Sequence, residues 1–200
     1  GEAVDQVGGP QIRNIGTIGG NTCNGVTSAD SASTLFAWDA VMEITGPQGV
    51  RQVPIQQFYI KAGQVALQHN ELETAILIKK ESYEGYRGHY IKYAMRNAMD
   101  IATCGCSVNV KLSADKKYIE DVRIAYGVAG PIPMRAPSAE AAAKGKPVSM
   151  ETVEAFGEAA LQDVNPRTSW RATKEFRLHL TRELAMRALK ESILCSGGAL

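Results

Sequence analysis

The clearest alternation of apolar and polar residues runs through residues 102–112. The even positions are Ala, Cys, Cys, Val, Val and Leu, and the odd positions between them are Thr, Gly, Ser, Asn and Lys. Because successive side chains of a strand point to opposite faces, this period of two predicts a half-buried strand. A second alternating run, residues 122–128, follows the turn at residues 113–117, and the two runs together predict an antiparallel hairpin.

Residues 90–94 are expected to add a third strand to this hairpin. The sheet is expected to end at Pro131-Ile132-Pro133, because proline cannot donate a ladder hydrogen bond. Helical patterns follow, first in the alanine-rich residues 138–144 and then in a helix that Ser149 could cap. That helix is predicted to bury Val153, Phe156 and Leu161. The last helix, residues 173–194, is predicted to bury one stripe of side chains: Phe176, Leu180, Leu184, Ala188 and Leu189.

The first half of the chain has a different pattern. Asp30 or Ser31 is expected to cap a short helix that carries Leu35, Phe36 and Trp38. Three strands are predicted after it, at residues 40–45, 50–53 and 74–79. The polar residues 79–88 are the best candidate for a boundary, which divides the chain into domains 1–86 and 87–200. The predicted fold class is α+β, with a three-stranded antiparallel sheet and a helical bundle in the second domain.

The composition excludes several classes of function but adds little to the prediction of the fold. Lys plus Arg number 22 and Asp plus Glu number 21, so a net charge of +1 gives no electrostatic reason for a nucleic-acid or anionic-membrane partner. No apolar run approaches the roughly 18 residues needed to span a bilayer. The four cysteines lack the spacing of a zinc or redox pair and are predicted to be reduced thiols in a cytoplasmic protein. Cys104 and Cys106 are expected in the core. Arg177, Arg182 and Arg187 are expected on a solvated helix face.

The segment Thr17-Ile18-Gly19-Gly20-Asn21 suits a backbone that approaches a ligand closely. Two adjacent glycines remove both side chains, so backbone N–H groups can face a phosphate or a ring edge. Asn21 and Asn24 add amides, and Asp30 adds an acceptor for ribityl or ribose hydroxyls. Taken alone, the same residues are also explained by a tight turn before a helix.

A resemblance to a known protein family favours the ligand-binding interpretation of this segment over a simple turn. The run from Gly9 to Gly25, continuing through Thr27-Ser28-Ala29-Asp30, resembles the second flavin-binding segment of molybdenum hydroxylase medium subunits. The similarity continues in order through residues 89–102 and again through residues 161–167 and 169–177. It is closest to the FAD subunits of bacterial xanthine dehydrogenases. The resemblance implies that the first domain is the second half of a flavin-binding α/β domain (PCMH type) and that the second is the family's C-terminal domain.

The resemblance also implies the site residues. FAD is expected against Gly16, Thr17, Ile18, Gly19, Gly20 and Asn21, with Asn24 and Asp30 along the same wall. Leu72 matches an apolar position that touches the cofactor, and Lys92 matches a lysine near the ring system. Residues 96–100 match a mobile loop beside the flavin, where Met99 replaces an acid of some relatives. Val7 stands where some relatives place a stacking aromatic. No catalytic acid, base, nucleophile or metal ligand is predicted.

The implied function is electron transfer: from iron–sulfur clusters to FAD and then to NAD or another acceptor. The implied partners are a molybdopterin-binding large subunit and a 2Fe-2S small subunit, and the implied substrate of the assembly is a heteroaromatic compound such as a purine. The family's N-terminal flavin half, with its own glycine-rich loop, is not found in the chain, so half of a cofactor cleft is expected. Two alternatives stay open. One is a non-catalytic scaffold that has lost flavin, and the other is a stand-alone PCMH-type flavoprotein.

Overall fold

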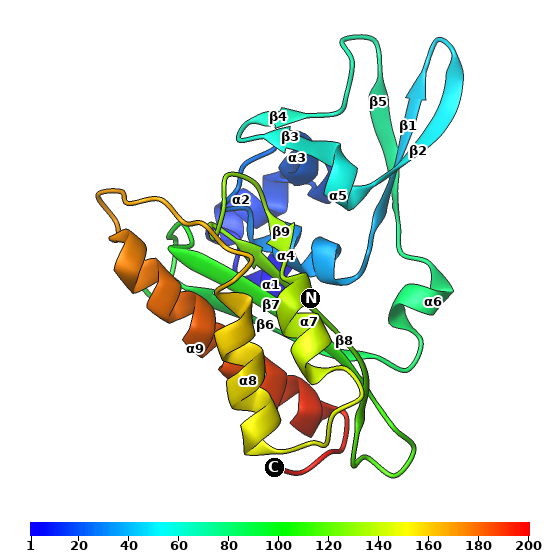
Figure 1. The fold of residues 1–200 in the computed structure, drawn as a ribbon. Coiled ribbons are helices and arrows are strands. Elements are labelled where there is room, and N and C mark those ends of the chain that lie inside the picture. Colours follow the sequence, from blue (N-terminus) through cyan, green and yellow to red (C-terminus); the bar gives the residue numbers. More distant parts are fainter.

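The structure, a computed structural model, describes residues 1–200 and contains two larger sheets and one two-stranded sheet, with helices packed on and between them (Figure 1). The first part begins with four helices: α1 (Glu2–Asp5), α2 (Pro10–Ile15), α3 (Ile18–Cys23) and α4 (Asp30–Ala37). A three-stranded antiparallel sheet follows in the order β2-β1-β5, made of β1 (Val41–Gly46), β2 (Gly49–Pro54) and β5 (Leu72–Leu77). Short elements complete this part: α5 (Ile55–Phe58), β3 (Tyr59–Lys61), β4 (Gln64–Val65) and α6 (Lys80–Tyr83).

The second part is an antiparallel sheet with three helices. Its strand order is β6-β7-β8-β9, made of β6 (Arg87–Tyr93), β7 (Cys104–Leu112), β8 (Ile119–Gly127) and β9 (Met134–Arg135). The helices are α7 (Pro137–Ala143), α8 (Met150–Ala160) and α9 (Lys174–Cys195). The three predicted strands are present. The expectation that the prolines end the sheet is wrong, because the residues that follow them have free N–H groups and pair with β8 as a fourth strand.

The strand β7 is buried on both faces, so the half-buried strand predicted from its alternation is wrong. Cys106 and Val108 face α8 and α9, but Ser107 and Asn109 on the other face are also buried. That second face is covered by α4, where the Ser107 hydroxyl lies 2.7 Å from Thr34 Oγ1 and 3.2 Å from Ser33 Oγ. Polar side chains mark this face because it meets a polar helix surface through hydrogen bonds rather than through apolar contact.

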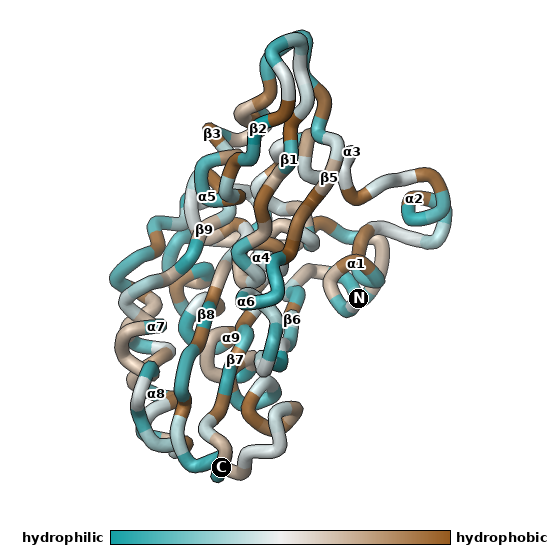
Figure 2. The backbone as a smooth tube through the Cα atoms, turned by 90° about the vertical axis from the view of Figure 1, so that its right-hand side faces the viewer, coloured by the Kyte–Doolittle hydropathy of each residue, from teal (hydrophilic) through white to brown (hydrophobic).

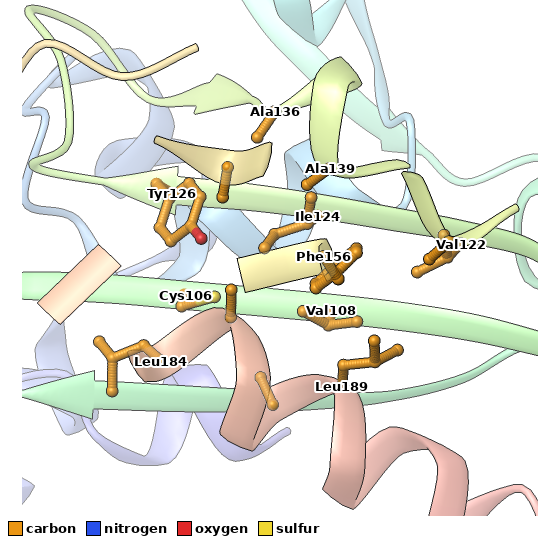
Figure 3. Close-up of a cluster of buried hydrophobic side chains, with 14 of the residues drawn as sticks. Cys106, Val108, Val122, Ile124, Tyr126, Ala136, Ala139, Phe156, Leu184 and Leu189 are labelled. Atoms are coloured by element: carbon orange, nitrogen blue, oxygen red, sulfur yellow. The ribbon is translucent and has the colours of Figure 1, made fainter. Parts of the chain in front are cut away.

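The main core lies between the second sheet and its helices (Figure 3). Phe156 and Val153 of α8 and Leu184 and Leu189 of α9 pack there against β7 and β8, and Cys104 and Cys106 are also completely or almost completely buried, as predicted. The Ser149 cap is confirmed, since its hydroxyl accepts the N–H of Thr152 at 3.2 Å. A second cluster, around Phe36, Met42 and Phe58, holds the first part together.

Three expectations about individual side chains are wrong. Leu161 is only half-buried because it lies beyond the end of α8. Phe176 is 40% exposed and packs edge-on against Tyr93 at the surface. Arg177 is only 3% exposed rather than solvated, because its guanidinium donates to the carbonyl of Thr103 and to Ser169 Oγ.

The predicted cap of α4 is also wrong. The N-cap residue is Ala29, without a side-chain hydrogen bond, and Asp30 is the first helical residue. The two polar side chains are used elsewhere: Asp30 bonds to Tyr90 and Lys92, and Ser31 donates to Asn21.

Charged groups join the two parts where α4 ends. Asp39 forms ion pairs with Arg135 at 2.5 Å and with Arg123 at 3.2 Å, which connects α4 to β9 and β8. The division of the chain near residue 86 stays a prediction. None of the helices is both long enough and apolar enough to cross a membrane.

Candidate functional site

A cavity of about 690 Å³ lies beside residues 16–21, which we call the glycine turn. Six predicted site residues line it: Gly16, Thr17, Ile18, Gly20, Asn21 and Asn24. The helix α2, which forms another wall, projects from the body of the molecule together with the loops on either side of it (Figure 2). The cavity is therefore bounded by a projecting helix and by the glycine turn.

The glycine turn is shaped by two close approaches. A side chain on Gly16 would place its Cβ 2.9 Å from the carbonyl oxygen of Ile12, so only glycine fits there without a shift of the backbone. Thr17 caps α3, and its hydroxyl accepts the N–H of Gly20 at 3.0 Å. A Cβ on Gly20 would lie 3.0 Å from the same hydroxyl. Gly16 and Gly20 thus bring only backbone to the cavity wall, which Thr17, Ile18 and Asn21 also line.

Apolar side chains form the rim of the cavity. Ile15 is 87% exposed, Ile12 is 57% exposed and Ile18 is 44% exposed, and all three line the same cavity. Contiguous exposed apolar groups around a hollow indicate a surface that a ligand or a partner covers. Two amides supply polarity: Asn24 is exposed at the end of α3, and Asn21 is held by Ser31, whose hydroxyl donates to its Oδ1.

Asp30 and Lys92 lie next to this cavity but form a buried ion pair of their own. The Lys92 ammonium lies 2.9 Å from Asp30 Oδ2 and also donates to the carbonyl of Gln6 at 2.9 Å. The Tyr90 hydroxyl donates to Asp30 Oδ1 at 2.7 Å. Burial raises the pKa of Asp30, and the hydrogen bonds and charge from Lys92 and Tyr90 oppose that rise. Lys92 lines a second cavity of about 610 Å³, which shares Arg13 with the first.

The structure does not bring Leu72 to the glycine turn. Leu72 is 72% exposed on β5 and lines neither cavity, whereas its neighbour Glu73 reaches under α3. The carboxylate of Glu73 lies 2.9 and 3.0 Å from the Thr22 hydroxyl and 3.4 Å from the Cys23 sulfur. The sequence analysis missed Glu73. The signal for it was an acid that interrupts the apolar strand one position after Leu72.

A third cavity, of about 660 Å³, gathers cations without counter-ions. It is lined by Lys61, Arg167, Arg171 and Arg177, and none of the four forms an ion pair. The buried Nε of Arg177 has no hydrogen-bond partner. Burial and the nearby charges of Arg167 and Arg171 lower the pKa of Arg177. Val26, Thr27 and Ser28 also line this cavity, so the chain passes directly from the glycine-turn cavity to it.

Two family models match the chain in succession. Residues 1–79 match the family described as FAD binding domain in molybdopterin dehydrogenase, and residues 89–192 match the CO dehydrogenase flavoprotein C-terminal domain. The xanthine dehydrogenase FAD-binding subunit of Escherichia coli O157:H7 is 46% identical over 198 residues, which is 99% of this chain and 67% of that protein.

Solved structures show the same fold. The carbon monoxide dehydrogenase from Hydrogenophaga pseudoflava which lacks the Mo-pyranopterin moiety of the molybdenum cofactor superposes with a TM-score of 0.87 at 29% identity. That match covers 96% of this chain and 65% of the other. The reconstituted CO dehydrogenase from Oligotropha carboxidovorans gives a TM-score of 0.88 at 26% identity, over 96% of this chain and 66% of that chain. The chain thus spans about two thirds of the length of these relatives.

The fold and the matched domains define a class, the FAD-binding components of dehydrogenases. The chain belongs to the family of FAD-binding medium subunits of molybdenum hydroxylases, which includes those of xanthine and carbon monoxide dehydrogenases. The residues present fit a flavin: Gly16 and Gly20 add no side chain to the cavity wall, isoleucines offer apolar contact, and Asn24 offers an exposed amide.

Proposed function

We propose that the glycine-turn cavity holds FAD and that this chain is an electron-transfer subunit. The observation that supports the proposal is the cavity itself, which is lined by the glycine turn and by the exposed side chains of Ile12, Ile15 and Ile18. Backbone N–H groups and the Asn21 and Asn24 amides would bind the polar parts of the cofactor, and Ile12, Ile15 and Ile18 would pack on its apolar surface. Lys92 and Asp30 would lie behind this wall as a paired unit. Leu72 stays a predicted contact.

Bound FAD takes up electrons at its ring system and releases them to a further acceptor. The chain's own residues orient the ring, exclude water from its apolar side and set the charge around it. The proposed partners are a molybdopterin-binding large subunit and a 2Fe-2S small subunit, together with an N-terminal flavin half that closes the cavity. The proposed substrate of the assembly is a purine-like heteroaromatic compound, and the proposed compartment is the cytoplasm.

The cation-lined cavity supports a negatively charged acceptor such as NAD. Four cations without ion pairs line one hollow, and Arg177 among them is buried, so an anion there would be favourable. Arginine is the side chain best suited to phosphate oxygens. Its volume is within the range of small-molecule sites, roughly 300–1,000 Å³. Its nearness to the glycine turn would place a bound acceptor beside the flavin.

Flavin binding is tested with Thr17→Val. The change removes the hydroxyl that caps α3 and holds the Gly20 N–H, so we expect FAD affinity to fall about tenfold, because loss of a cap costs on the order of 1 kcal/mol and the turn loses its shape. Thr173→Val is the matched control, since Thr173 caps α9 in the same way, with the Phe176 N–H at 3.2 Å. The measurement is the flavin absorption retained after desalting, with and without the N-terminal flavin half of a relative. Equal FAD affinity in both variants would contradict the assignment of the glycine-turn cavity as the FAD site. No retained flavin in any mixture favours the scaffold alternative.

The acceptor site is tested with Arg171→Gln. Removing one cation that can bond to a phosphate is expected to weaken NAD binding about tenfold, and titration calorimetry measures the change. Arg187→Gln is the matched control, because Arg187 is an exposed arginine of α9 whose only carboxylate contact is a 3.9 Å pair with Glu183. A similar loss of NAD affinity in both variants would mean that the net charge of the protein, and not a specific site, causes the effect. Absence of NAD binding in the unchanged protein contradicts the assignment of this acceptor.

A further inference from the structure

Glu73 is an acid placed directly beneath the glycine turn without a cation to balance it. It belongs to β5 and is half-buried against α3, and it forms no ion pair with any Lys, Arg or His. One carboxyl oxygen lies 3.5 Å from the position that a Cβ of Gly19 would occupy. The carboxyl group therefore touches the underside of the turn whose upper side lines the cavity.

Too few hydrogen-bond donors surround Glu73 to serve all of the acceptors there. The Thr22 hydroxyl lies 2.9 Å from the carbonyl oxygen of Gly19 and 3.2 Å from that of Ile18, as well as within 3.0 Å of both carboxyl oxygens of Glu73. A threonine hydroxyl has one proton to donate, so it cannot serve the carboxylate and the turn at once. A protonated Glu73 removes the conflict, because its own O–H donates to Thr22 Oγ1 and leaves the threonine proton for Gly19.

The surroundings of Glu73 favour the protonated state. The titratable groups that face it are Cys23 from α3 and Tyr59 from β3. Burial, with the charge of Glu73 next, raises the pKa of Cys23 to about 11, so the thiol stays protonated and can donate to the other carboxyl oxygen. The Tyr59 hydroxyl is buried without a partner, and its pKa is also raised by burial and by Glu73. Burial raises the pKa of Glu73 itself, and the bonds from Thr22 and Cys23 partly offset the rise.

We propose that Glu73 is a positioning residue for the glycine turn: when its carboxyl is protonated it donates to Thr22, so that the Thr22 hydroxyl holds the carbonyl of Gly19 and keeps the turn in the shape that receives the flavin. This role rests on the proposed function of the cavity. When Glu73 ionises, the Thr22 proton turns to the carboxylate, the Gly19 carbonyl loses its donor, and the turn loosens. The chain Cys23, Glu73, Thr22, Gly19 thus connects the protonation of one buried acid to the geometry of the flavin wall.

The sign of the pH effect follows from the raised pKa. A carboxyl group that is easier to protonate in the fold than in the unfolded chain stabilises the fold below its ordinary pKa, and that contribution is lost as pH rises through the folded value. Stability of the unchanged protein is therefore expected to fall as pH rises above about 4.3, the ordinary glutamate value. FAD affinity depends on the folded state alone, so it is expected to fall as pH rises through the higher folded pKa of Glu73.

The test compares the unchanged protein with Glu73→Gln. A glutamine amide donates to Thr22 and accepts from Cys23 at every pH, so the variant is expected to keep the FAD affinity of the protonated form and to lose its pH dependence. FAD affinity is measured by flavin fluorescence between about pH 5 and pH 9. Glu43→Gln is the matched control, because Glu43 lies on the neighbouring strand β1 and accepts from a threonine in the same way, with Thr74 Oγ1 at 3.2 Å. This control is expected to follow the unchanged protein.

A second measurement does not depend on flavin. The melting temperature of the flavin-free protein is expected to fall with rising pH, relative to that of Glu73→Gln. If the unchanged protein and Glu73→Gln give parallel profiles in both measurements, another group is responsible and the role of Glu73 is overturned. A different outcome is that the melting temperatures separate as expected but neither protein binds flavin. That result supports the raised pKa of Glu73, but it contradicts the proposed function of the cavity and therefore the positioning role.

Discussion

Replacing Asp30 with leucine is expected to lower the free energy of unfolding by about 3–5 kcal/mol. The Lys92 side chain is 8% exposed, and its ammonium lies 2.9 Å from the Asp30 carboxylate. Without the carboxylate, a buried ammonium keeps only the carbonyl of Gln6 as a partner, and the Tyr90 hydroxyl loses its acceptor. Urea unfolding followed by circular dichroism measures the change.

The Asp30→Leu, Lys92→Met double variant distinguishes the effect of removing the whole ion pair from the effect of leaving one buried charge without a partner. Removing both charges leaves no uncompensated ion, so we expect the double variant to be more stable than Asp30→Leu alone. Lys92→Met alone leaves a carboxyl whose pKa burial already raises, so its unfolding free energy is expected to fall as pH rises above about 3.9, the ordinary aspartate value. Additive losses in the double variant would show that the two groups do not depend on each other.

Replacing Phe156 with alanine is expected to cost about 3–5 kcal/mol of unfolding free energy. Phe156 is completely buried at the centre of α8 and faces the β7–β8 side of the core (Figure 3). The adjacent contact of α8 with α9 is already close, because a Cβ on Gly157 would lie 2.6 Å from the side chain of Met186. The helices have little freedom to move into the vacated space, so a cavity remains.

Glu154→Ala is the matched control for the core substitution. Glu154 lies on the exposed side of the same helix, and its removal is expected to change stability by less than about 0.5 kcal/mol. Both variants are compared by urea unfolding with the slope held common. A loss well under 2 kcal/mol for Phe156→Ala would mean that the helices collapse onto the sheet, which contradicts a rigid contact at Gly157.

Local patterns predicted most of the second part of the fold. Residues 102–112 and 122–128 alternate with a period of two, and both strands formed close to the predicted places. Ser149 and Thr173 have the side chains that cap helices, and α8 and α9 begin directly after them. In these cases the chemistry that decides the element lies within a few residues of it.

Patterns failed where a distant segment supplied the partner. The odd positions of β7 were expected in solvent, and only the packing of α4 shows why Ser107 is buried among hydroxyl groups. Asp30 and Ser31 have the side chains of capping residues, but these side chains bond to Lys92 and Asn21 and do not cap α4. Arg177 was expected in solvent, but the carbonyl of Thr103 and the hydroxyl of Ser169 accept its hydrogen bonds.

The sequence by itself determined the family and most of the order of strands and helices in the second part, because these depend on residues that are close in the chain. It also predicted the glycine turn as the place for a ligand. The tertiary structure alone decided which groups face that turn. It paired Asp30 with Lys92 across 62 residues and set Glu73 under Thr22 across 51 residues. It also gathered Lys61 with three arginines around one cavity. Burial and charge act through distance in space, so their effect on a carboxyl group appears only when the chain is folded.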